Sequence, residues 1–251
     1  MDYLHKPNRL LITGRSGTGK TEYFIRYVRA VSPRYKRVCV FDHECEFCAR
    51  TGVEPCRTAD DLGKNLPVEC FDYAALYPGD KTTALEFHAD WVFSRNEAAE
   101  DNPPQTLWCC DEMQKILGTD LIPPDVACVI ETGRRYRIDT VLVTQQPNLL
   151  HNRFRNQATE VVTFRQNDSR AIQWLEEWGF SEEQIRGLDP GEYLCLTDQG
   201  QFRTGNIFSG KTAPARPVPL TVQSDQEENG QETNPENSVD RESSLEHSGK
   251  R

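Results

Sequence analysis

Short apolar runs, separated by polar or helix-compatible stretches, recur along most of the chain. Each run is almost continuously apolar over five or six positions, which is typical of strands that are buried on both faces of a mainly parallel sheet. The predicted strands are Arg9–Thr13, Arg37–Asp42, Thr106–Asp111, Thr140–Gln145 and Glu160–Arg165.

The stretches between these runs predict helices over Thr21–Ala30, Ala84–Ala98, Pro124–Thr132 and Asp168–Glu177. Two later runs, Gly191–Thr197 and Gln201–Ile207, flank the turn sequence Asp198-Gln199-Gly200 and predict a terminal β-hairpin. Because strands alternate with helices, the fold class is expected to be α/β, with a doubly wound, mainly parallel sheet.

The last part of the chain differs in composition from the rest. Residues 221–251 hold eight acidic and three basic residues, a balance of -5 out of the total of -10, and no aromatic residue. Such a segment buries too little apolar surface to offset its ordering entropy. We therefore expect one domain over residues 1–215 and a disordered acidic tail over 216–251. The acidic total argues against nucleic acid as a partner, but less strongly once the tail is set aside.

Nine cysteines are spread along the chain, and no charged-then-apolar signal segment stands at its start. Several of them lie within apolar runs, namely Cys39, Cys109, Cys110, Cys128 and Cys195. This pattern favours a reduced, cytoplasmic protein whose cysteines are mostly small core residues. No apolar run approaches the roughly 20 residues that a membrane helix requires, so no membrane segment is expected.

A phosphate-binding loop follows the first predicted strand directly. Its sequence has glycine, four variable residues, then glycine, lysine and threonine, and it comprises Gly14, Arg15, Ser16, Gly17, Thr18, Gly19, Lys20 and Thr21. The glycines allow backbone N–H groups to surround phosphate oxygens, and the next helix adds partial positive charge. Lys20 is expected to reach the β- and γ-phosphates of ATP, and the Thr21 hydroxyl to hold Mg²⁺.

Two further strand ends supply the remaining parts of such a site. Asp111 and Glu112 follow a buried apolar run, which predicts Asp111 as a second Mg²⁺ ligand, mostly through water, and Glu112 as the general base. Gln145 ends the next strand and is expected to orient the attacking water, with Thr144 and Gln146 beside it.

Two stretches after the acidic strand carry further motifs. Glu131–Pro147 has a Gly-Arg pair, an apolar strand and then Thr-Gln-Gln-Pro, and Leu188–Tyr193 has a Leu-x-Pro-Gly-Glu turn. These motifs resemble the FtsK/HerA superfamily of DNA-pumping ATPases, which often have the same turn. The likeness covers roughly residues 7–210, and the short length resembles the genome-packaging ATPases of membrane-containing, double-jelly-roll phages and viruses.

The resemblance implies a RecA-like (ASCE) P-loop NTPase that forms a ring, usually a hexamer, around double-stranded DNA. ATP would lie between neighbours, and an arginine of one subunit would stabilise the transition state in the next. Arg134 and Arg135 match the family position for this arginine, and Arg153 and Arg155 are second candidates. A packaging role would place the protein in the host cytoplasm or at a capsid vertex, with other virion proteins as partners.

Other functions remain open at this point. A small-molecule kinase or GTPase shares the phosphate loop, but the chain lacks the Asn-Lys-x-Asp guanine motif. A phage assembly factor of the Zot type would use nucleotide only to switch protein contacts. A zinc site built from Cys45 and Cys48, with His43, Cys56 or Cys70, is less favoured because its second ligand pair is not closely spaced. Core packing is the favoured interpretation of Trp174 and Trp178.

Overall fold

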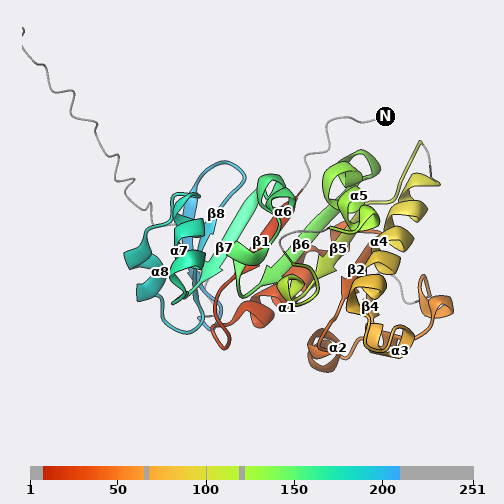
Figure 1. The fold of residues 1–251 in the computed structure, drawn as a ribbon, viewed down its shortest axis with the longest axis horizontal. Coiled ribbons are helices and arrows are strands. Elements are labelled where there is room, and N and C mark those ends of the chain that lie inside the picture. Colours follow the sequence, from red (N-terminus) through yellow and green to blue (C-terminus); the bar gives the residue numbers. More distant parts are fainter. Residues whose placement is uncertain (1–7, 65–67, 100, 119–121, 210–251) are drawn as a thin grey trace, which may run out of the picture. The chain divides into compact units, whose positions relative to one another are not determined.

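The computed structural model describes residues 8–64, 68–99, 101–118 and 122–209 (Figure 1). The predicted domain boundary between residues 215 and 216, and the acidic tail after it, lie outside these residues. The described strands form one nine-stranded sheet in the order β3-β4-β2-β5-β6-β1-β7-β8-β9. The strands from β3 to β7 are parallel to their neighbours, so the predicted α/β fold with a mainly parallel sheet is confirmed.

The five predicted parallel strands are all present, with ends that differ from the prediction by at most two residues. They are β1 (Arg9–Thr13), β2 (Arg37–Phe41), β5 (Thr106–Cys110), β6 (Ile138–Thr144) and β7 (Glu160–Phe164). Strand β6 lies between β1 and β5, and β1 lies between β6 and β7. The carboxyl ends of β1, β5 and β6 therefore meet at one edge of the sheet, and their starts meet at the opposite, amino edge.

The predicted hairpin is also present, and it closes one side of the sheet. Strand β8 (Glu192–Leu196) pairs antiparallel with β7 and with β9 (Phe202–Asn206). On the other side, β4 (Val68–Phe71) and the two-residue β3 (Pro55–Cys56) extend the sheet and were not predicted. Strand β4 carries a buried Glu69, which interrupts the apolar run that would have revealed it.

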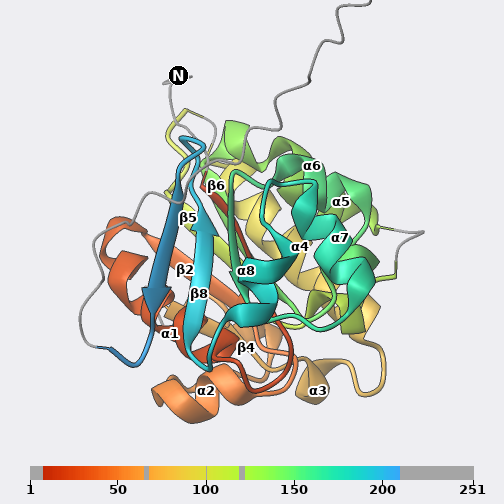
Figure 2. The same ribbon diagram turned by 90° about the vertical axis from the view of Figure 1, so that its left-hand side faces the viewer.

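Helices cover both faces of the sheet (Figure 2). On one face α1 (Lys20–Val31) packs its apolar side onto Leu10 and Ile12. On the other face lie α4 (Lys81–Glu97), α5 (Pro124–Thr132) and α7 (Ser169–Glu176), close to the predicted ranges. Four short helices were not predicted: α2 (Glu46–Thr51), α3 (Tyr73–Leu76), α6 (Asn152–Gln157) and α8 (Glu182–Gly187).

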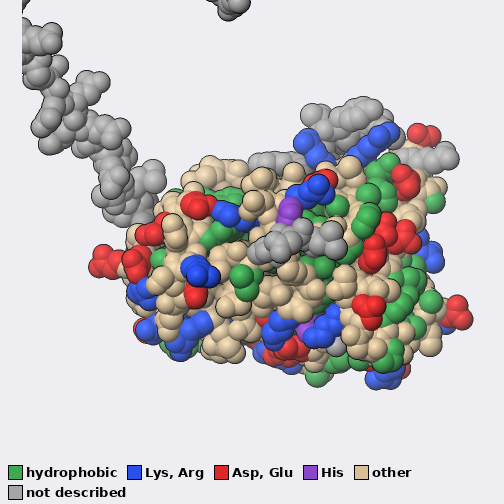
Figure 3. Space-filling model, in the orientation of Figure 1, with side chains coloured by type: hydrophobic (Ala, Val, Ile, Leu, Met, Phe, Trp, Pro, Cys, Tyr) green, Lys and Arg blue, Asp and Glu red, His purple; other side chains and the backbone are tan. Residues whose placement is uncertain are grey.

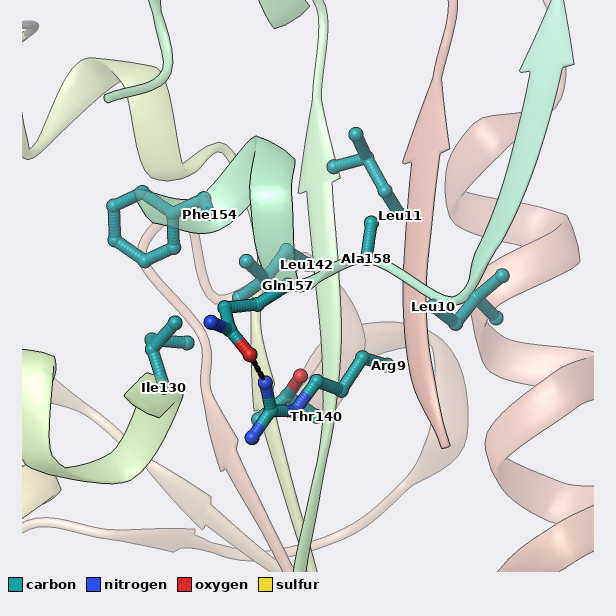
Figure 4. Close-up of a pocket in the computed structure, with 9 residues that line it drawn as sticks. All are labelled: Arg9, Leu10, Leu11, Ile130, Thr140, Leu142, Phe154, Gln157 and Ala158. Atoms are coloured by element: carbon teal, nitrogen blue, oxygen red, sulfur yellow. Dashed lines mark hydrogen bonds between the residues drawn. The ribbon is translucent and has the colours of Figure 1, made fainter. Parts of the chain in front are cut away.

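A small apolar hollow lies under α5 and α6, against strands β1 and β6 (Figure 4). Its volume is about 10 Å³, close to the minimum that holds one water molecule. The Arg9 guanidinium reaches into it and donates a hydrogen bond to the Gln157 side chain. Burial lowers the pKa of Arg9, while the carboxylate of Asp139 opposes that shift. The hollow is therefore a packing feature of the core.

The cysteines correct one sequence expectation. Cys39, Cys109 and Cys110 are buried as predicted, but Cys48 of α2 and Cys70 of β4 form a disulfide. The expectation of reduced cysteines is wrong for this pair, because the fold brings together two residues that are 22 positions apart.

The remaining zinc candidates and the tryptophans are also placed. Within the described residues, the potential metal ligands that cluster around the disulfide are Asp42, Cys48 and Cys70, without Cys45, Cys56 or His43. Trp174 is buried and Trp178 packs against the same core, with ring centroids 5.8 Å apart, which confirms core packing. None of the described helices is long and apolar enough to cross a membrane.

Candidate nucleotide site at the carboxyl edge

The loop between β1 and α1 has the backbone that its glycines predict. Gly14, Gly17 and Gly19 adopt φ values of 149°, 77° and 115°, a region that side chains with a Cβ rarely enter. A Cβ on Gly14 would also come within 2.6 Å of the Phe164 Cβ. The sequence therefore folds here into a tight loop that leads directly into the N-terminus of α1, where anions are favoured.

Backbone hydrogen bonds fasten this loop to its surroundings. The Arg15 N–H donates to the carbonyl of Arg165 at 3.0 Å, and the Gly191 N–H donates to the carbonyl of Thr18, also at 3.0 Å. The Ile207 N–H in turn donates to the carbonyl of Gly191 at 2.9 Å. The loop is thus held by the end of β7 and by the hairpin, which pre-organises it for a ligand.

Lys20 is buried, with only 5% of its surface exposed, although it carries an ammonium group. Its Nζ donates to the Arg15 carbonyl at 3.1 Å, across the inside of the loop. Burial lowers the pKa of Lys20, and the carboxylates of Glu112 and Asp111 oppose that shift. A buried cation with one carbonyl partner among the described residues is favourably placed to exchange that partner for phosphate oxygens.

Asp111 and Glu112 follow strand β5 and are both buried, with 4% and 6% of their surfaces exposed. Glu112 has a left-handed backbone with φ of 50°, and its N–H donates to the Asp111 Oδ1 at 2.9 Å. Burial, and then the charge of Glu112, raise the pKa of Asp111 to about 7. Two acidic groups so close together in a buried site favour a bound cation.

Gln145 follows β6 and points at the same place. Its Nε2 donates to the Glu112 Oε1 at 2.8 Å, and Gln114 donates to the other Glu112 oxygen. A second amide, Gln166, is buried behind it and donates to the Thr13 Oγ1 at 3.1 Å and to the Gln145 carbonyl at 3.0 Å. The fold therefore fixes the positions of Glu112 and Gln145 from two neighbouring strands.

One open pocket of about 420 Å³ joins these groups. It is lined by Ser16, Gly17, Gly19, Lys20, Thr21, Glu22, Glu44, Glu46, Arg50, Glu112, Gln145 and Phe208. Gly14, Arg15 and Thr18 complete the loop behind it. Most of the predicted phosphate-site residues thus meet at this pocket.

Several residues that line this pocket, or lie beside it, were not predicted from the sequence. The Thr21 hydroxyl donates to the Glu46 Oε2 at 3.4 Å, and Lys115, 3.9 Å from Glu112, pairs with Glu44. Phe208 is 65% exposed although it is a large apolar side chain. These residues come from short segments without periodicity, so no pattern in the sequence marked them.

The predicted arginines lie outside this pocket. Arg134 and Arg135 are in the 3₁₀ turn Gly133–Tyr136, which precedes β6 and so lies at the amino edge. On α6, Arg153 forms an ion pair with Glu131 at 3.1 Å, and Arg155 pairs with Glu177. The structure thus separates the Arg134–Arg135 pair from the phosphate loop by the length of β6.

The fold and the loop together define a P-loop ATPase fold. Comparisons with protein-family models and with curated protein sequences find no match. Among solved structures, the chain is similar to the genome packaging NTPase B204 from Sulfolobus turreted icosahedral virus 2, in complex with AMPPCP. The TM-score is 0.58 and the identity 16%, over 84% of this chain and 98% of that chain.

Two larger ATPases share the fold. The pCW3 conjugation coupling protein TcpA aligns with a TM-score of 0.53 and 11% identity, over 76% of this chain and 58% of that one. Thermomonospora curvata EccC aligns with a TM-score of 0.54 and 10% identity, over 79% of this chain and 36% of that one. The resemblance read from the sequence is confirmed at the level of the fold.

Proposed function

We propose that this protein is an ATP-driven translocase of double-stranded DNA that packages a viral genome into a preformed capsid. The observation that carries the ATPase part is the meeting of three strand ends at one pocket: the phosphate loop after β1, Glu112 after β5, and Gln145 after β6. The buried Asp111 lies directly behind Glu112, whose N–H donates to it. The packaging part is supported by the similarity in fold to a packaging NTPase that covers 98% of that protein.

In the proposed reaction, the loop N–H groups and Lys20 bind the phosphates of ATP. Thr21 and Asp111 would hold Mg²⁺, which would supply charge compensation for the phosphates when bound, and this assignment fits the buried pair of carboxylates. Glu112 takes the proton of the attacking water, and Gln145 orients that water through its hydrogen bond to Glu112. Glu112 lines the pocket and has an αL backbone conformation.

The transition-state arginine is proposed to come from a neighbouring subunit. Arg134 and Arg135 are exposed and lie at the other end of β6 from Gln145, so they do not reach the phosphate loop of their own chain. In a ring, the Gly133–Tyr136 turn of one subunit would approach the nucleotide pocket of the next, and a closed rotation completes the ring. Ring assembly, usually as a hexamer, is therefore part of the proposal.

The proposed partners are duplex DNA and, at a capsid vertex, other virion proteins, with the host cytoplasm as the place of action. TcpA, named as a conjugation coupling protein, has the same fold, which supports a place among DNA-handling motors. Lys20, Thr21 and the buried carboxylates are equally suited to a nucleotide-switched assembly factor of the Zot type, so DNA dependence is the property that discriminates.

The test is ATP hydrolysis with and without linear duplex DNA, for the wild-type protein and for Lys20→Ala. We expect duplex DNA to raise the rate of hydrolysis and Lys20→Ala to abolish it, because the buried ammonium is the proposed phosphate ligand. If duplex DNA does not change the rate of hydrolysis, the ATPase assignment stands, but the assembly factor becomes a better proposal than the translocase. Hydrolysis that survives in Lys20→Ala would refute the ATPase site itself.

A further inference from the structure

A second open pocket, of about 490 Å³, lies at the amino edge of the sheet, opposite the nucleotide pocket. It is lined by Arg34, Lys36, Arg37, Asn102, Pro103, Pro104, Gln105 and Arg137. Four of these eight side chains are cationic and none is acidic, in a chain whose net charge is -10. Lys and Arg side chains are visible along the upper rim of Figure 3, the rim at which β1 begins in Figure 1.

The pocket is built on the starts of three strands, and Gln105 connects them. The Lys36 N–H, just before β2, donates to the Gln105 carbonyl at 2.8 Å. The Arg137 Nε, just before β6, donates to the Gln105 Oε1 at 3.3 Å, and the Arg137 carbonyl accepts from the first residue of β5 at 3.0 Å. The positions of the cations are therefore set by the sheet.

The charges of this pocket are not neutralised by ion pairs within the part of the chain that the structure describes. Among the described residues, no carboxylate forms an ion pair with Arg34, Lys36, Arg37 or Arg137. The buried Nη1 of Arg37 has no hydrogen-bond partner in the part of the chain described. Its guanidinium lies 5.9 Å from the ring centre of Trp91, which holds it in place from one side.

The acidic groups near the pocket do not cancel this charge. Asp139 is 2% exposed, and it accepts hydrogen bonds from Tyr35 at 2.8 Å and from Gln105 at 3.0 Å. Asp101 is exposed beside Asn102 but does not line the pocket. Three exposed cations, Arg34, Lys36 and Arg137, therefore converge with the half-buried Arg37 on one pocket, and this charge favours an anionic ligand.

We propose that this amino-edge pocket binds the phosphodiester backbone of duplex DNA. The inference rests on the proposed function for the identity of the anion and adds where the contact is made. Arginine and lysine side chains that come from two separate segments, residues 34–37 and Arg137, suit successive phosphates of a polymer, since such contacts carry affinity without reading sequence. The pocket has no glycine loop to enclose the terminal phosphates of a free nucleotide, as the carboxyl-edge pocket has.

The test compares two charge-matched triple variants by fluorescence anisotropy with a short labelled duplex, over a range of salt concentrations. The first is Arg34→Gln, Lys36→Gln and Arg137→Gln, which removes the three exposed pocket cations. The second is Arg29→Gln, Arg170→Gln and Arg203→Gln, which removes three exposed cations outside the pocket. Thermal melting of both variants establishes that each is folded.

We expect the pocket variant to reduce the slope of log affinity against log salt by roughly 0.9 for each lost phosphate contact, or about 2 to 3 in total. The matched variant is expected to keep the wild-type slope. If both variants bind duplex DNA with equal salt slopes, the proposal that this pocket binds DNA is wrong, while the proposed translocase function is unaffected. Absence of duplex binding by the wild-type protein overturns both.

Two competitors identify the ligand. A synthetic peptide of residues 221–251, with its balance of -5, is expected to compete weakly. If that peptide binds the wild-type protein as tightly as the duplex does, and loses this binding in the pocket variant, then the pocket is a protein-docking site and the proposal fails. Tripolyphosphate is expected to displace the duplex only at high concentration, since it offers few phosphates at once; displacement at concentrations matching the duplex would make the pocket a free-phosphate site.

Discussion

The two edges of the sheet use charge in opposite ways. At the carboxyl edge, Lys20, Asp111 and Glu112 are nearly fully buried and interact with one another. At the amino edge, Arg34 and Lys36 are exposed and have no ion-pair partner among the described residues. Buried, mutually oriented charges favour chemistry on a small ligand, because the low dielectric strengthens every interaction. Exposed like charges favour attraction of a large polyanion, which salt weakens.

The largest test of this contrast is a matched pair of acid-to-amide changes. Glu112→Gln at the carboxyl edge removes the proposed general base but keeps the shape, so the rate of ATP hydrolysis should fall by roughly 10²- to 10⁴-fold while ATP binding remains. Asp101→Asn at the amino edge should leave hydrolysis within about twofold, because that carboxylate is exposed and lies outside both pockets. The measurements are the single-turnover rate of ATP hydrolysis and the nucleotide affinity of both variants. Equal losses of hydrolysis in the two variants would contradict the assignment of catalysis to the carboxyl edge alone.

The second test uses pH. The raised pKa of Asp111, about 7, means that the acid form predominates below that pH and the carboxylate above it. Because Mg²⁺ needs the carboxylate, affinity for Mg-ATP should fall below about pH 7, by up to roughly tenfold per pH unit. ATP binding in the presence of a chelator is the control and should lack this dependence. A pH-independent affinity for Mg-ATP would remove Asp111 from the metal site.

Duplex binding provides the amino-edge counterpart of that experiment. Guanidinium groups keep their charge at all ordinary pH values, so DNA affinity should change little over the range in which Mg-ATP affinity changes. The same buffers serve for both ligands, which makes the two edges directly comparable.

The third and smallest test compares two buried amides with similar structural roles. Asn96 is fully buried, and its Nδ2 donates to the carbonyls of Pro104 and Tyr136 at 2.9 and 2.8 Å. Gln166 is buried at the other edge and braces Thr13 and Gln145. Alanine at either position should lower the free energy of unfolding by about 1–3 kcal/mol, since buried partners are left unsatisfied.

The two variants should differ in their rate of ATP hydrolysis, although they lose similar free energy of unfolding. Gln166→Ala loosens the support of Gln145 and is expected to slow hydrolysis, whereas Asn96→Ala is expected to slow it much less at a temperature where both are folded. Urea unfolding and DNA-free hydrolysis of the two variants give the comparison. A larger catalytic loss in Asn96→Ala would mean that the amino edge controls the chemistry directly.

The sequence predicted the central sheet well and its flank poorly, for a physical reason. Strands β1, β5 and β6 are buried on both faces, so their apolar runs are unbroken. Beyond β2, the elements are two to six residues long, and β4 places Glu69 in the interior, where the carboxylate accepts a hydrogen bond from the Gly63 N–H. Such short elements have no detectable period, and tertiary packing decides them.

The candidate site divides in the same way. The loop, Asp111, Glu112 and Gln145 were predictable because each directly follows a recognisable strand. Glu46 and Phe208 were not, since only the folded chain brings α2 and the segment after β9 to the loop. The positions of Arg134 and Arg135 at the amino edge follow from strand direction, but their role in a neighbouring site still rests on resemblance.

The two outer strands of the described sheet bear on how copies of this chain can associate. At one side β3 has two residues and begins with Pro55, which has no N–H to offer to a further strand. At the other side β9 exposes Arg203 and contains Gly205, which weakens a strand as a template. Both borders discourage edge-to-edge strand addition, and with it amyloid-like growth. A high local concentration of subunits, as any ring assembly would create, is therefore compatible with solubility.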